Sequence, residues 1–117
     1  MQHEFIKLDK NDIPETVTYL LKGDNEVIVL DDCVIVNNPV FLRGFSTYKV
    51  SLKNAGEGLD YHGNTIIPTS SLPIFIANLK QAKKNKEQKE YCCQITRLIQ
   101  FCQQAFEENK YIVHFGL

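Results

Sequence analysis

Cysteine and histidine are the residue types in this chain with the greatest capacity for chemistry, because a thiolate beside an imidazole makes a nucleophile with its base. The sequence offers Cys33 or Cys93 as the thiol and His62 or His114 as the base. Cys33 opens an apolar run that favours packing, whereas the exposure of Cys93 stays open. His62 lies in a turn and His114 alternates with apolar neighbours, which predicts solvent-facing positions. We therefore expect no enzyme.

The four cysteines, Cys33, Cys92, Cys93 and Cys102, lack the paired spacing of a structural zinc site. No secretory leader pattern opens the chain, so reduced thiols and a cytoplasmic location are expected. No apolar run approaches the roughly 18 residues that span a bilayer. We expect no metal, no cofactor and no membrane attachment.

Acidic residues are concentrated in the first half of the chain. Residues 1–60 hold ten Asp or Glu against six Lys or Arg, and residues 61–117 hold four against seven, so balances of −4 and +3 give the net charge of −1. Four acids stand in predicted turns, namely Asp31, Asp32, Glu57 and Asp60. Turn chemistry alone explains them, but acids that converge at one sheet edge would also attract a basic partner. Our leading hypothesis is a protein-binding module, most concretely an immunity or inhibitor protein that neutralises a toxin.

Lysines in the second half of the chain support an alternative. The cluster consists of Lys80, Lys83, Lys84, Lys86 and Lys89. Binding to phosphates needs several cations within a short reach, and Tyr48 and Tyr61 would add stacking surfaces on the sheet. The alternative function is therefore binding of single-stranded nucleic acid. A solvated connection between helices explains the same lysines, and Glu87 and Glu90 interrupt the cluster.

Three helices are predicted from capping residues and apolar stripes. The first covers residues 13–22, between the capping residue Asp12 and Gly23. The second begins after one of the capping candidates Thr69, Ser70 and Ser71, with a stripe at Leu72, Phe75, Ile76, Leu79 and Ala82. The third covers residues 88–108, with a stripe at Tyr91, Ile95, Leu98, Ile99, Cys102, Ala105 and Phe106. This last periodicity places Cys102 in the core.

The remaining chain is typical of strands separated by turns. Short β-like runs cover residues 4–9, 27–30, 33–36, 48–52, 65–67 and 110–117. Their tight spacing favours antiparallel hairpins, so we expect a meander of four to six strands with helices packed on one face. With 117 residues, 44% of them hydrophobic, the chain is the size of a single α+β domain. The oligomeric state is not predicted by these patterns.

Overall fold

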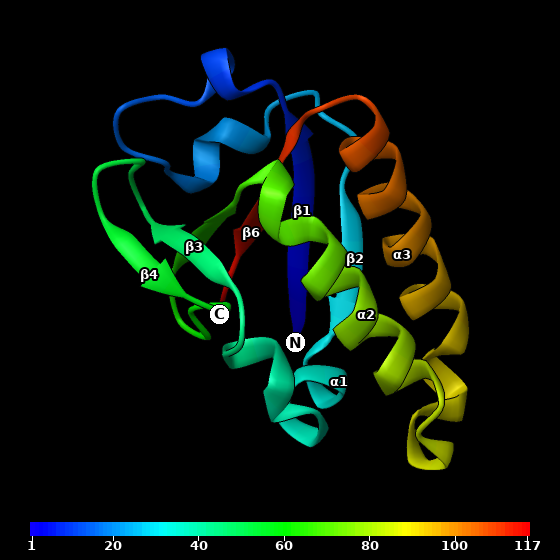
Figure 1. Cartoon of the computed structure of the whole chain (residues 1–117). Coiled ribbons are helices and arrows are strands. Elements are labelled where there is room, and N and C mark those ends of the chain that lie inside the picture. Colours follow the sequence, from blue (N-terminus) through cyan, green and yellow to red (C-terminus); the bar gives the residue numbers. More distant parts are fainter.

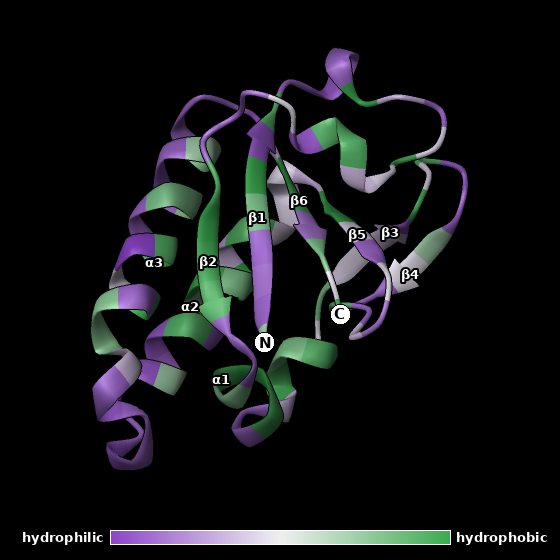
Figure 2. Ribbon diagram, turned by 180° about the vertical axis from the view of Figure 1, so that it is seen from behind, coloured by the Kyte–Doolittle hydropathy of each residue, from purple (hydrophilic) through white to green (hydrophobic).

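The computed structural model describes residues 1–117 and has an α+β fold, as the sequence predicts. Its six strands form one antiparallel sheet in the order β2-β1-β6-β5-β3-β4 (Figures 1 and 2). The strands are β1 (Gln2–Leu8), β2 (Ile28–Asp31), β3 (Ser46–Lys49), β4 (Ala55–Glu57), β5 (Asn64–Ile67) and β6 (Tyr111–Phe115). The last strand, β6, lies between β1 and β5, so the order differs from the consecutive meander that hairpin spacing predicts.

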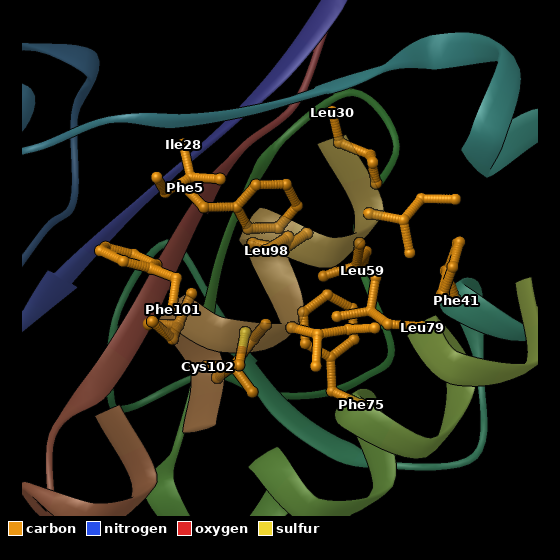
Figure 3. Close-up of a cluster of buried hydrophobic side chains, with 14 of the residues drawn as sticks. Phe5, Ile28, Leu30, Phe41, Leu59, Phe75, Leu79, Leu98, Phe101 and Cys102 are labelled. Atoms are coloured by element: carbon orange, nitrogen blue, oxygen red, sulfur yellow. The ribbon is translucent and has the colours of Figure 1, made fainter. Parts of the chain in front are cut away.

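Two long helices, α2 (Leu72–Lys83) and α3 (Cys92–Glu107), cover one face of the sheet (Figure 1). Figure 3 shows Phe5, Phe75 and Leu98 directed into the core beneath them. Most of the predicted stripe on α3 is buried, and Cys102 is fully buried, but Tyr91 is only partly buried and Phe106 is 48% exposed. The helix begins at Cys92 rather than at residue 88, because residues 86–91 form a tighter turn capped by the Asn85 side chain.

The segment before β2 covers part of the other face of the sheet (Figure 2). The predicted helix at residues 13–22 is wrong, since this segment forms only two short 3₁₀ turns, Lys10–Asp12 and Tyr19–Lys22. Val17 is buried against the sheet, and its backbone N–H donates to the carbonyl of Val50. Its carbonyl accepts from the side chain of Asn64. These bonds tie the backbone to the sheet in place of a helical ladder.

The predicted strand at residues 33–36 is also wrong, because these residues belong to the short helix α1 (Asp32–Asn37). The Asp31 side chain accepts from the backbone N–H of Cys33 and so caps the helix. Val34 and Ile35 are buried while Cys33 and Val36 are exposed. Strong β propensity is overridden here by a cap and by packing. Asp31 and Asp32 therefore occupy a junction between strand and helix, not a hairpin turn.

Candidate functional site

Two histidines meet in the interior of the fold. His3 on β1 and His114 on β6 are both fully buried, and His3 Nδ1 lies 2.8 Å from His114 Nε2. The solvent-facing position predicted for His114 is wrong, because β6 is a central strand with side chains packed on both faces. His3 belongs to no apolar stripe or sequence motif, so its place in the interior could not be predicted from the sequence. Only the pairing of β1 with β6 brings the two rings together.

Asp32 holds the outer end of this pair. Its Oδ1 lies 3.0 Å from His3 Nε2, and the hydroxyl of Tyr61 donates to its Oδ2 at 2.8 Å. Burial acts to raise the pKa of Asp32, but the hydrogen bonds from Tyr61 and His3 outweigh it and hold this pKa below its ordinary value. Asp32 is therefore a carboxylate near neutral pH. Two segments distant in sequence, α1 and the loop after β4, are joined at this residue.

Thr65 holds the inner end of the pair. His114 Nδ1 lies 3.4 Å from Thr65 Oγ1, which also accepts from the backbone N–H of Asp60. Burial, together with the nearby charge of His3, lowers the pKa of His114 to about 3. A neutral His114 fits both contacts. No buried side-chain nitrogen or oxygen in the protein lacks a partner, so this polar network is fully satisfied.

The predicted acids fall into two groups. Asp31, Asp32 and Asp60 lie on the two segments that Tyr61 joins, and with Tyr61 they form what we term the acidic rim. Asp31 accepts from Cys33 N–H, and Asp60 accepts from His62 N–H at 3.2 Å. Glu57 lies on the edge strand β4, not in the turn that its neighbours predict, and accepts from Gly44 N–H. No hydrogen bond or ion pair links Glu57 to the rim.

The candidate nucleophiles do not meet a histidine. Cys33 is exposed, contrary to its predicted packing role, and none of the four cysteines is hydrogen bonded to a histidine. Cys93 is exposed and His62 is exposed in its turn. Cys33 instead lies beside Tyr91, and that contact, partial burial and the charge of Asp31 raise the pKa of Tyr91 to about 12. No group of three or more His, Cys, Asp or Glu side chains is arranged to hold a metal ion.

The predicted lysines line two neighbouring hollows where α2 is followed by α3, in the hydrophilic part of the helices seen in Figure 2. We term this region, with Lys80, Lys83, Lys84, Lys86 and Lys89, the lysine corner. One hollow of about 570 Å³ is also lined by Thr96, Gln100 and Gln103 from α3. The other, of about 420 Å³, reaches Asn85 and Cys92. All five lysines are exposed, and none forms an ion pair.

The two tyrosines proposed as stacking surfaces lie apart from the lysine corner. Tyr48 is half-buried against the smaller core cluster, on the face of the sheet opposite to α2 and α3. Tyr61 packs against the larger cluster and donates to Asp32. Both faces of the sheet carry packed side chains, so the tyrosines and the lysines do not form one continuous surface.

None of the helices combines the length and apolar character needed to cross a bilayer. The sequence matches no model of a protein family, and neither a curated protein nor a solved structure matches it.

Proposed function

We propose that this protein is a non-catalytic binding protein whose acidic rim covers a basic surface of another protein, most concretely a toxin that it inhibits. The observation that carries the proposal is that Asp31, Asp32 and Asp60 each accept a hydrogen bond within the fold, on two segments that the Tyr61–Asp32 bond joins. Asp32 is held ionised by two side chains. Asp31 and Asp60 each use Oδ1 for an internal bond, and no hydrogen bond of the protein uses their second oxygen.

Such an arrangement suits a specific protein partner. Charged groups that are already ordered lose little side-chain entropy on binding, so more of the interaction appears as affinity. Tyr61 and Tyr91 are partly exposed beside these carboxylates, and tyrosine is enriched among residues that dominate interface energies. Val36 adds an exposed apolar side chain on α1, with 58% of its surface accessible. A rim of this composition combines charge with apolar anchors.

The direct test is to look for a toxin encoded beside the gene for this protein and to capture it with the protein. We expect a stable complex in a pull-down and protection of cells in a co-expression assay. Asp31→Asn combined with Asp60→Asn should raise the Kd at least about tenfold, since close charge pairs across interfaces contribute about 1.5 kcal/mol or more. The matched control is Lys83→Gln with Lys84→Gln, which changes two charges at the lysine corner and should leave the Kd unchanged.

Two results would count against the proposal in different ways. Absence of any complex with the neighbouring toxin would remove the toxin version of the function. A complex that forms with normal affinity despite both rim substitutions would show that another surface binds the partner.

We propose, as a second candidate, that the lysine corner binds single-stranded nucleic acid. The specific observation in its favour is that all five lysines are exposed and unpaired around adjoining hollows lined by amide side chains. Cations without a carboxylate partner are available to phosphates, and their binding releases counterions. Gln100 and Gln103 offer hydrogen-bond donors in the same hollow.

Fluorescence anisotropy with an oligothymidine measures this activity. Affinity should fall steeply between about 50 and about 200 mM salt, and replacing Lys83, Lys84 and Lys86 with Glu should reduce the slope of log K against log salt by about 2. Replacing the exposed lysines Lys10 and Lys49 with Glu serves as the control. A loss of affinity per substitution that is equal in both variants would indicate only a general effect of net charge.

A further inference from the structure

The buried histidine pair has more hydrogen-bonding capacity than packing requires. A continuous chain of four polar side chains crosses an otherwise apolar layer, in the order Thr65, His114, His3 and Asp32. The distances are 3.4 Å from Thr65 to His114, 2.8 Å from His114 to His3 and 3.0 Å from His3 to Asp32. The chain ends outside the core at Asp60 on one side and at Tyr61 on the other. Both ends belong to the acidic rim. The chain therefore links two positions of the rim through the interior.

With both rings neutral, every bond in the chain runs in one direction. Asp32 is an acceptor, so His3 Nε2 carries the proton and His3 Nδ1 accepts from His114 Nε2–H. His114 Nδ1 then accepts from the Thr65 hydroxyl, whose oxygen accepts from Asp60 N–H. Each nitrogen has a partner of the correct kind in this arrangement.

One additional proton fits the same geometry if the direction of the inner bonds reverses. With one solvent proton added to the pair, His114 carries a proton on Nδ1, and the proton formerly on His114 Nε2 lies on His3 Nδ1. His3 becomes an imidazolium that donates to both His114 and Asp32, while His114 stays neutral in its other tautomer. A second proton has no place, because two imidazolium rings would face each other at 2.8 Å.

We propose that His3 and His114 form a pair that takes up a single proton, and that this proton reverses the tautomer of His114 and neutralises the charge of Asp32 at the acidic rim. The inference rests on the proposed function for its biological meaning, since a basic partner would then bind more weakly as the pH falls. Loss of one close charge pair would raise the Kd of such a partner about tenfold. The pair would act as a pH-sensitive element of the rim.

The groups around the pair do not supply another site for the proton. Asp32 on α1 and Tyr61 in the loop after β4 face the histidine pair directly. Further out, Cys33 interacts electrostatically with Tyr61, and the amino group of Met1 interacts electrostatically with Asp32. Strand β5 contributes the uncharged Thr65, and β2 contributes apolar Leu30 opposite His3. Phe5 packs between His114 and Phe75 of α2, so this helix faces the pair through apolar rings. The aspartate and the two rings therefore form one directly connected set of groups.

Nitrogen NMR of the free protein labelled in its histidines tests the inference from about pH 8 to about pH 5, the range in which imidazoles titrate. At high pH we expect protons on Nε2 of both buried rings. On acidification, His3 should gain a second proton while His114 stays neutral and moves its proton to Nδ1. The exposed His62 gives a reference signal in the same sample. Asp32→Asn removes the charge that stabilises the imidazolium and should suppress proton uptake by the folded pair.

Three outcomes would overturn the inference: double protonation of both rings in the folded protein, a His114 tautomer that does not change as His3 titrates, or no proton uptake before unfolding. The measurement is made without a partner, so these outcomes concern the histidine pair alone. Failure to capture a toxin concerns the proposed function alone.

Discussion

The acidic rim and the lysine corner carry opposite charges, and they also differ in how these charges are held. Each carboxylate of the rim accepts a hydrogen bond from the protein itself, and Asp32 accepts two from side chains. The five lysines of the corner form no ion pair. Charges that accept internal hydrogen bonds favour a partner of one geometry, whereas exposed charges without an ion pair suit a polyanion without fixed shape. The same contrast predicts different responses to mutation.

The largest expected effect is on stability at Asp32. Asp32→Ala removes the acceptor of both His3 Nε2–H and the Tyr61 hydroxyl, and leaving such groups unpaired costs about 3 kcal/mol. Lys83→Ala at the lysine corner should change the free energy of unfolding by less than about 0.5 kcal/mol. Urea denaturation measures both. Similar losses in the two variants would mean that the rim is no more ordered than the corner.

Acid should destabilise the protein through the same network. The pKa of His114 is lowered from 6.5 to about 3 by burial first and by His3 second, so the unfolded chain binds a proton that the folded protein excludes. Stability present above pH 6.5 is then lost as the pH falls toward 3, by about 2 kcal/mol between 6.5 and about 5. Urea titrations at several pH values give this slope. His62→Asn, which changes an exposed ring, should leave it unaltered.

A smaller loss is expected at the cap of α1. Asp31→Ala removes the acceptor of Cys33 N–H and should cost about 1 kcal/mol, whereas Asp31→Asn keeps a capping oxygen and should cost much less. Thermal unfolding of the two variants separates the capping role of Asp31 from its charge. Equal losses would indicate that the charge itself stabilises the helix.

The smallest effect is a difference in local potential, which two cysteines report. Cys33 lies beside the acidic rim, and Cys92 lines a hollow of the lysine corner. In a Cys93→Ser background, the rate ratio of anionic iodoacetate to neutral iodoacetamide should be several-fold higher at Cys92 than at Cys33. Mass spectrometry of the modified peptides measures both sites at once. High salt should abolish the difference, because it screens exposed charges beyond a few ångströms.

Prediction from the sequence was most accurate where apolar residues recur with a regular period over a long segment. The stripe of α3 located Cys102 in the core, and the α+β class followed from the distribution of elements. Short segments were predicted poorly, since the cap at Asp31 and the contacts of Val17 depend on tertiary structure. The histidine pair could not be foreseen, because β1 and β6 lie at opposite ends of the chain. The lysines were identified by composition, but their hollows required the helix arrangement.

The position of β6 has a consequence for the order of folding. The pair β2-β1 and the group β5-β3-β4 are connected in the sheet only through β6. A growing chain that has reached residue 110 therefore has no continuous sheet, although most of its core residues have been made. Both faces of the core close only when residues 111–115 enter between the two halves. The protein is expected to fold after synthesis of this strand, in a single late step of high contact order.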